Sequence, residues 1–191
     1  MTGSPQKRVL AIDPTHRGFG YVIFEGPDFL IDWGVRHVEG PKNKASIAAA
    51  AELITRYRPR IMVLEDVAAK GCRRCRRVRE LVDGLEWYGR ERGLTVRKVA
   101  QSRVKRIFLP LGIRNKNEMA RFIAAKFPEL GRYLPPERKA WMSEDTRMAV
   151  FDAAAFVLAF FLASKASNQH ETTDIGYRSE TGDGSSNRLA Q

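Results

Sequence analysis

Three acidic residues end or interrupt strongly apolar stretches of the chain. Asp13 and Glu65 each follow a run of four apolar residues, and Asp152 is the one charged residue between positions 148 and 161. An ionised carboxylate in apolar surroundings is costly unless it is paired or binds a metal ion. Three oxygen ligands without histidine or cysteine suit Mg²⁺ or Mn²⁺, and two such ions about 4 Å apart promote phosphodiester hydrolysis. We therefore hypothesise that Asp13, Glu65 and Asp152 are catalytic metal ligands.

Each of these acids also has a structural explanation. Asp13 precedes Pro14, as turn residues often do, and Glu65 could form a surface salt bridge. Asp152 is the hardest to explain structurally, whereas Asp66 would point to the opposite face of its strand from Glu65. The metal hypothesis requires the three carboxylates to form one cluster, and salt bridges on all three would count against it.

The elements that would position these acids follow from hydrophobic periodicity and turn residues. The expected strands are residues 8–13, 19–24, 29–38, 60–65 and 94–99. The expected helices are residues 44–57, 72–92, 102–109, 117–127 and 143–163. This order predicts one α/β domain, residues 1–165, with a mixed five-stranded sheet whose first three strands form an antiparallel meander.

The last part of the chain, residues 166–191, has a different composition. It is rich in Ser, Thr, Asn, Gly and Asp and contains almost no large apolar side chain. Such a segment cannot bury enough surface to offset its chain entropy. We expect it to be a disordered tail.

The carboxyl ends of the sheet strands are the expected place for a ligand site. In open α/β sheets, ligands bind outside these strand ends. Asp13 and Glu65 would meet there if strands 8–13 and 60–65 are neighbours that run in the same direction. A helix crossing that edge could bring Asp152 to them.

The charge of the chain favours a polyanionic partner. It has 33 Lys and Arg against 22 Asp and Glu, a formal net charge of +11. Six basic residues lie close together after Glu65, namely Lys70, Arg73, Arg74, Arg76, Arg77 and Arg79. We interpret them as contacts to nucleic-acid phosphates, the alternative being a solvated helix face.

The two cysteines, Cys72 and Cys75, form a CxxC pair. Structural zinc needs four ligands and the chain has no second pair, so we expect both to pack on the buried face of a helix together with Val78. Low cysteine content and no basic-then-apolar leader favour a cytoplasmic protein. The apolar run at residues 153–163 is too short for a bilayer, which needs about 20 residues.

With these features in place, the chain resembles the RuvC-like branch of the RNase H-like nucleases, which includes the Holliday-junction resolvases. The stretch VLAIDPTHRGFGYVIF is similar to the family's first two strands, PRIMVLEDV to its fourth strand and FDAAAFVLAF to its last helix. Between them, VAQSRVKRIFLPLGIRNKNEMARFIAAKF follows the family's order of elements. The resemblance covers residues 8–163 and implies that Asp13, Glu65 and Asp152 hold two Mg²⁺ or Mn²⁺ ions.

One position departs from the family pattern. Members usually carry a second acid or a histidine one helical turn before the final Asp, where this chain has Ala149. Asp145, seven residues before Asp152, could supply the fourth catalytic carboxylate if the start of the helix bends inward. A charge that stabilises the helix N-terminus is the alternative reading of Asp145.

The function implied by the resemblance is that of a Mg²⁺-dependent endonuclease acting on branched DNA, such as a four-way junction. Symmetric cutting of both strands needs two active sites, so a homodimer is expected with that substrate. One alternative is a nuclease of the same fold that cuts structured RNA or R-loops. Another is a nucleic-acid-binding module without catalysis, which Ala149 would favour.

Overall fold

The structure, a computed structural model, describes residues 7–136 and 143–174. The chain divides into two compact units, residues 1–161 and residues 162–191. The sheet, the helices that cover it and all the acidic residues considered above belong to the first unit.

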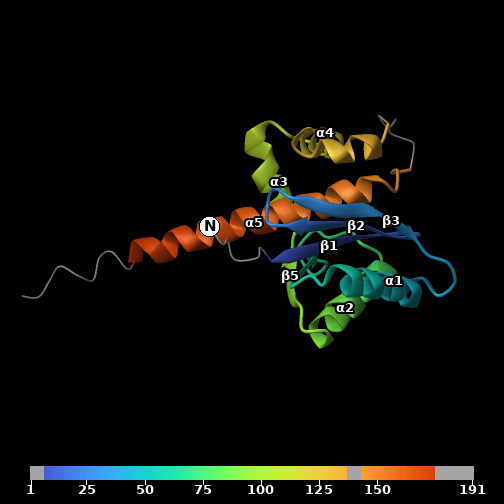
Figure 1. The fold of residues 1–191 in the computed structure, drawn as a ribbon. Helices are drawn as coiled ribbons and strands as arrows, with labels where there is room; N and C mark the ends of the chain where they lie inside the picture. Colours follow the sequence, from blue (N-terminus) through green and yellow to red (C-terminus); the bar gives the residue numbers. More distant parts are fainter. Residues whose placement is uncertain (1–6, 137–142, 175–191) are drawn as a thin grey trace, which may run out of the picture. The chain divides into compact units, whose positions relative to one another are not determined.

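Five strands form one mixed sheet in the order β3-β2-β1-β4-β5 (Figure 1). Their bounds are β1 (Arg8–Thr15), β2 (Gly18–Glu25), β3 (Leu30–His37), β4 (Ile61–Glu65) and β5 (Thr95–Val99). The first three strands form an antiparallel meander, while β4 pairs in parallel with both β1 and β5. The predicted α/β fold class with a mixed five-stranded sheet is confirmed.

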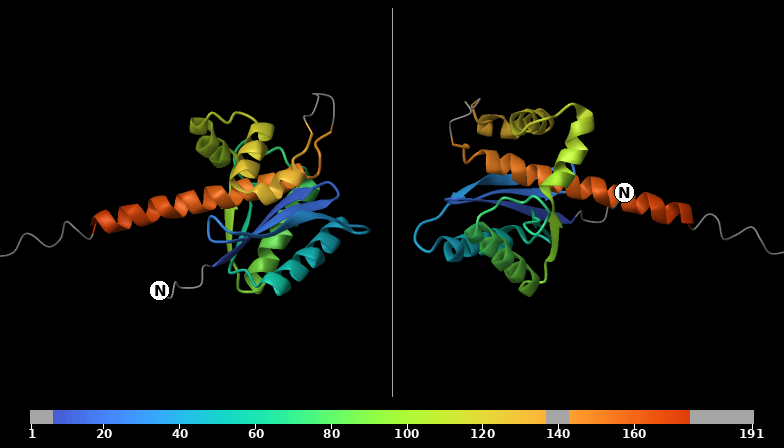
Figure 2. Two further views of the ribbon diagram at one scale, coloured as in Figure 1. Left: turned by 45° about the horizontal axis from the view of Figure 1, so that its top comes forward. Right: turned by 180° about the vertical axis from the view of Figure 1, so that it is seen from behind.

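Helices cover both faces of this sheet. Their bounds are α1 (Lys42–Tyr57), α2 (Arg76–Glu91), α3 (Gln101–Phe108), η1 (Leu109–Leu111), α4 (Lys116–Lys126), η2 (Pro128–Tyr133) and α5 (Met148–Asp174). Helices α1 and α2 pack on one face, and α5 packs on the other with α3 and α4 outside it. Figure 2 shows the same layers from two further directions.

The alternation of side chains divides the central strands between two cores. On β1 and β4, the side chains that join the core with α1 and α2 are those of Leu10, Ile12, Met62 and Leu64. The alternate side chains, which join the core with α5, are those of Val9, Ala11 and Val63. Because side chains alternate along a strand, Asp13 and Glu65 continue the second set and lie on the α5 face.

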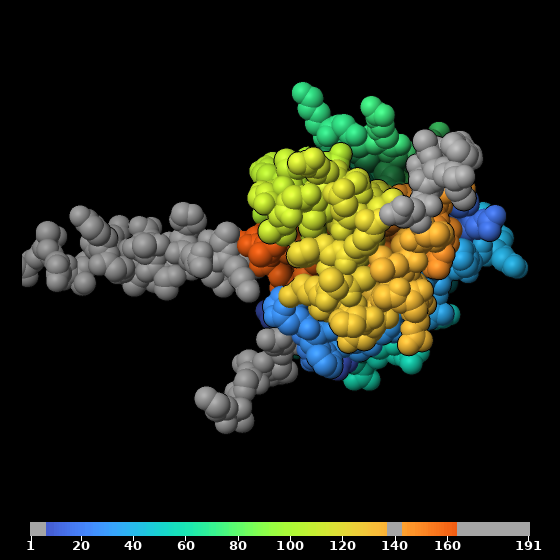
Figure 3. Space-filling view, turned by 90° about the horizontal axis from the view of Figure 1, so that it is seen from above, coloured from blue at the N-terminus to red at the C-terminus, as the bar shows by residue number. Residues whose placement is uncertain are grey.

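Helix α5 is buried without interruption from Met148 to Ala159. The sheet lies on one side of it, and the space-filling view shows α3, η1, α4 and η2 hiding most of residues 148–161 on the other (Figure 3). This double coverage explains why the segment is apolar all round. The helix approaches β2 closely at Gly20, where an added Cβ would lie 2.5 Å from the carbonyl carbon of Ala149.

Several element boundaries differ from the prediction. The helix expected at residues 72–92 begins at Arg76, because the preceding segment is held in turns by its own hydrogen bonds. The prediction that both cysteines pack on a helix is therefore wrong: Cys72 is half-buried against the core, but Cys75 is exposed at the start of α2.

The end of the chain differs as well. The helix expected at residues 143–163 is α5, which begins at Met148 and continues to Asp174, into the segment expected to be a tail. The rest of that segment, residues 175–191, lies outside the described residues. Of the helices that the structure describes, none has the length and apolar character needed to cross a bilayer.

Candidate active site

Asp13 and Glu65 lie side by side at one edge of the sheet. The parallel pairing of β1 with β4 joins Ile12 to Leu64, so the next residue of each strand is an acid. Both are almost fully buried, with 2% of Asp13 and 3% of Glu65 exposed. The condition set by the sequence, neighbouring strands running in the same direction, is met.

Asp152 reaches this edge from α5. It is 3% exposed, and its Oδ2 accepts a hydrogen bond from Lys116 Nζ at 2.6 Å. Lys116 also forms an ion pair with Glu144 at 3.0 Å. The negative charge of Asp152 raises the pKa of Asp13, and that of Glu65 does so too, so both acids lie within electrostatic reach of Asp13.

Arg74 lies between the two strand-end acids. Its Nε donates to Glu65 Oε2 at 2.5 Å, its Nη2 donates to Asp13 Oδ1, and its Nη1 donates to the carbonyl of Pro14 at 3.1 Å. The side chain is 26% exposed. One guanidinium thus joins the ends of β1 and β4.

The electrostatics of the cluster are dominated by burial. Desolvation raises the pKa of Asp13 well above its usual value, although Arg74 acts against this. Desolvation likewise raises the pKa of Asp152 against the effect of Lys116. Burial alone would lower the pKa of Arg74 and of Lys116, but the neighbouring carboxylates raise both instead.

The charges in this cluster do not balance. Counted over the described residues that pair or interact here, four carboxylates, those of Asp13, Glu65, Asp152 and Glu144, meet two cations. With all four carboxylates ionised, two negative charges are left, which is the charge that one divalent cation would neutralise. In donor type, burial and net charge, the acids fit Mg²⁺ or Mn²⁺.

The side chains as they stand, however, do not form a ready metal site. In residues 7–136 and 143–174, no three acidic, histidine or cysteine side chains are placed to hold an ion. Asp13, Glu65 and Asp152 all carry salt bridges, the arrangement that counts against the metal hypothesis. Asp13 and Glu65 share Arg74, so moving that one side chain would release both, whereas Asp152 shares Lys116 with Glu144.

The fourth carboxylate is placed differently from the prediction. Asp145 is held by Arg147, whose Nη2 donates to Asp145 Oδ2 at 2.6 Å, and this bonding lowers the pKa of Asp145. Its neighbour Glu144 pairs with Lys116 and acts on the pKa of Asp152. Both residues line a small pocket of about 160 Å³ beside Asp13. Sequence reasoning missed Glu144, for which adjacency to Asp145 was the available signal.

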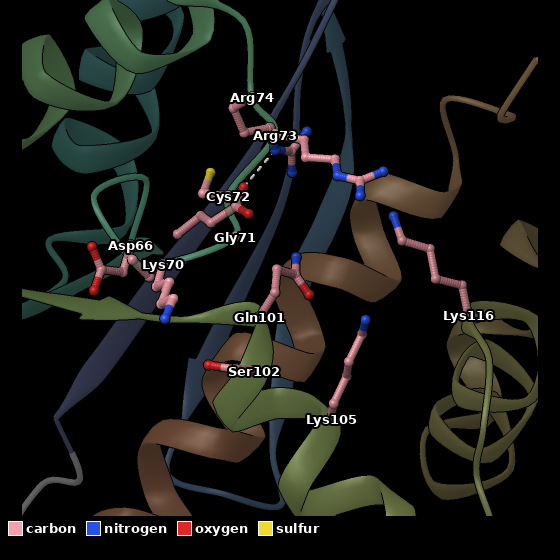
Figure 4. A pocket seen from close by; sticks show the side chains of 12 residues that line it. Asp66, Lys70, Gly71, Cys72, Arg73, Arg74, Gln101, Ser102, Lys105 and Lys116 are labelled. Atoms are coloured by element: carbon pink, nitrogen blue, oxygen red, sulfur yellow. Dashed lines mark hydrogen bonds and ion pairs between the residues drawn. The ribbon is translucent and has the colours of Figure 1, made fainter.

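A larger pocket of about 700 Å³ opens beside the acids and is strongly basic. Lys70, Arg73 and Arg74, three of the six residues predicted to contact phosphates, line it from the segment after β4. Lys105 and Lys116 extend into it from α3 and α4 (Figure 4). Glu65 also lines this pocket, so an anion bound there would lie next to the acidic cluster.

Lys105 and Lys116 were not predicted. Lys116 is the first residue of α4, where Asn115 caps the helix by accepting a hydrogen bond from the Glu118 backbone at 2.9 Å. A cation at a helix N-terminus is disfavoured by the helix dipole. That disfavoured position was the signal that Lys116 serves the site rather than the helix.

The other three predicted basic residues do not line the larger pocket. Arg76 is exposed and pairs with Glu80 one helical turn away. Arg77 donates to the carbonyl of Thr15 at 2.8 Å and to Asn43. Arg79 donates to three backbone carbonyls, those of Val67, Cys72 and Arg74. These bonds give Arg79 a structural role, and its contact to phosphate stays a prediction.

The fold is shared with solved junction resolvases, although no protein-family model and no curated protein matches the sequence significantly. The structure titled Thermus thermophilus RuvC is 19% identical and has a TM-score of 0.58, with 83% of this chain and 96% of that chain covered. The same organism's RuvC in complex with a Holliday junction substrate is 17% identical, with a TM-score of 0.55 and coverage of 84% and 97%.

The yeast mitochondrial Holliday junction resolvase Ydc2 is 14% identical, with a TM-score of 0.55 and coverage of 88% and 85%. At these identities the likeness concerns the fold. The resemblance to the RuvC-like branch expected from the sequence is confirmed at that level.

Proposed function

We propose that this protein is a Mg²⁺-dependent endonuclease that cuts branched DNA, with four-way junctions as the leading substrate. The observation that carries the proposal is the convergence of Asp13, Glu65 and Asp152 at one sheet edge, next to a basic pocket of about 700 Å³. The fold shared with junction resolvases supports it. A homodimer is part of the proposal, because symmetric cutting requires two sites. The cytoplasmic location expected from the low cysteine content is part of it too.

The residues have separate roles in this proposal. Asp13, Glu65 and Asp152 would hold the metal, and Glu144 is the nearest further carboxylate. When bound, Mg²⁺ supplies Lewis acidity and a water molecule of lowered pKa. Lys70, Arg73, Lys105 and Lys116 hold the phosphodiester beside the acids through charge-assisted hydrogen bonds.

In this proposal, binding and chemistry belong to different elements of the fold. Asp13 lies two residues before the end of β1, Glu65 is the last residue of β4, and Asp152 comes from a helix that is packed on both sides. The basic residues come from a loop and from the exposed ends of α3 and α4. Fixed carboxylates and adaptable cations suit a substrate whose backbone must bend into the site.

A second candidate is a nucleic-acid-binding module without catalysis. It is favoured by Ala149, which stands where the family usually has an acid or histidine, and by the ion pairs on all three predicted ligands. The basic pocket would then bind phosphates without cutting.

Cleavage across a panel of nucleic acids tests these alternatives. Purified protein at low salt in Mg²⁺ is incubated with a four-way junction, linear duplex DNA, an R-loop and structured RNA, and Asp152→Asn is run beside it. We expect incision of the junction by the wild type, none by the variant, and equal binding by both. Junction binding by both proteins with no incision would identify the binding module, and preferential cutting of RNA or R-loops would replace the substrate.

A further inference from the structure

Arg74 lies between two places where it could bind an anion, the acidic cluster and the basic pocket. Its guanidinium contacts Asp13 and Glu65, and the same residue lines the basic pocket together with Lys70, Arg73 and Lys105. The forked N–H groups of a guanidinium can form paired hydrogen bonds with either a carboxylate or a phosphate. A phosphate in the pocket would therefore offer Arg74 an alternative to the carboxylates.

We propose that Arg74 competes with divalent cations for the carboxylates of Asp13 and Glu65, and that nucleic-acid phosphate in the adjoining pocket draws it away. The inference rests on the proposed function and deepens it by linking metal binding to substrate binding. Arg74 is in this account a positioning residue, because it acts by occupying or releasing the metal ligands.

The contacts of the surrounding loop allow this movement. The segment that carries Arg74 is anchored by Arg79, which donates to the carbonyls of Val67, Cys72 and Arg74 itself. Among the described residues, Arg74 donates to one backbone carbonyl, that of Pro14, and to the carboxylates of the two acids. Rotation of the Arg74 side chain thus leaves the backbone held in place.

The charge of the cluster makes the exchange favourable with both ligands present. With Arg74 in place, the four carboxylates still exceed the cations by two charges. Its departure increases this excess, which raises the attraction for a divalent ion. Reciprocally, a divalent ion bound to Asp13 and Glu65 frees Arg74 for phosphate, so each ligand increases the affinity for the other.

Mn²⁺ affinity, measured from the EPR signal of free Mn²⁺, tests the proposal without any cleavage assay. The full chain is compared with Arg74→Ala, with Arg74→Gln and with the matched control Arg73→Ala, which removes the same charge from the same pocket. We expect Mn²⁺ to bind roughly tenfold more tightly to both Arg74 variants, because a competing unit charge in contact with the ligands is gone. Arg73→Ala should stay close to the wild type.

A second measurement examines the link to nucleic acid. Non-cleavable four-way-junction DNA should increase the Mn²⁺ affinity of the wild type by a larger factor than that of Arg74→Gln. Circular dichroism shows whether each variant folds. If Arg74→Ala does not fold, Arg74→Gln, which retains hydrogen-bond donors, takes its place in the comparison.

The outcomes are separable. Folded Arg74 variants that bind Mn²⁺ no more tightly than the wild type would overturn the proposal and make Arg74 a structural clamp. If the site exists, Asp13→Asn should abolish Mn²⁺ binding. Mn²⁺ binding that is absent from the wild type and the Arg74 variants, or that Asp13→Asn leaves unchanged, would instead overturn the metal site itself and with it the proposed function.

Discussion

The two faces of the central strands use the same backbone for different purposes. On the face toward α1 and α2, β1 and β4 present apolar side chains such as Ile12 and Leu64. On the face toward α5, the residue that follows each of these is a buried acid, Asp13 or Glu65. A shift of one position along a strand therefore separates packing from chemistry. Substitutions on the α5 face should therefore reduce cleavage with little loss of stability, and substitutions on the other face should reduce stability with little loss of cleavage.

The largest effect is expected on the α5 face. Asp13→Asn and Asp152→Asn should each reduce junction cleavage by roughly 10³-fold or more, about 4 kcal/mol of transition-state stabilisation. The free energy of unfolding should change little, because each replacement removes a buried charge but keeps the shape. Single-turnover cleavage and urea unfolding measure the two quantities. Variants that still cut at the wild-type rate would remove these residues from the reaction.

The opposite result is expected on the other face. Leu64→Ala should lower the free energy of unfolding by about 2–5 kcal/mol, because it leaves a cavity in the core with α1 and α2. Cleavage per folded molecule should stay close to that of the wild type below the unfolding transition. A loss of cleavage as large as that of Asp13→Asn, with little loss of stability, would show that the faces are not separate.

The contact between Gly20 and α5 joins stability to the site. Gly20→Ala places a Cβ 2.5 Å from the Ala149 carbonyl carbon, so the helix must shift away from β2. We expect a loss of about 1–3 kcal/mol in the free energy of unfolding and a parallel loss of cleavage, since Asp152 lies on the same helix. Thermal unfolding and cleavage of the variant measure both. An unchanged melting temperature and cleavage rate would mean that the close contact between Gly20 and α5 does not position Asp152.

The smallest effect concerns the fourth carboxylate. Glu144→Gln should weaken Mn²⁺ binding by about tenfold, because Glu144 shares Lys116 with Asp152, whereas Asp145→Asn should change it less. The matched pair differs by one position and removes one charge in each case. A larger effect of Asp145→Asn would return the role to the residue that the sequence favoured.

Much of the site follows from local sequence rules. Asp13 and Glu65 are identifiable because each ends a short apolar run, and parallel strands place their carboxyl ends at one edge. Asp152 is identifiable because a charge inside a buried helix needs a partner. These rules depend only on residues adjacent in the chain, and the structure brings all three acids to the same edge.

The cations around the acids depend on longer-range contacts. Arg74 reaches Asp13 on the neighbouring strand because Arg79 holds the segment that follows β4 in turns. The helical spacing of Cys72, Cys75 and Val78 in the sequence concealed these turns. Lys105 and Lys116 look like surface charges of short helices, and only the packing of α3 and α4 over α5 brings them to the pocket.

The proposed function depends on divalent cations being held by Asp13, Glu65 and Asp152. Anomalous diffraction from crystals grown with saturating Mn²⁺ and junction DNA would locate these ions. We expect anomalous peaks within coordination distance of the three carboxylates, with Arg74 turned toward phosphate. Peaks confined to other sites, with Arg74 and Lys116 still paired to the carboxylates, would contradict the proposed function.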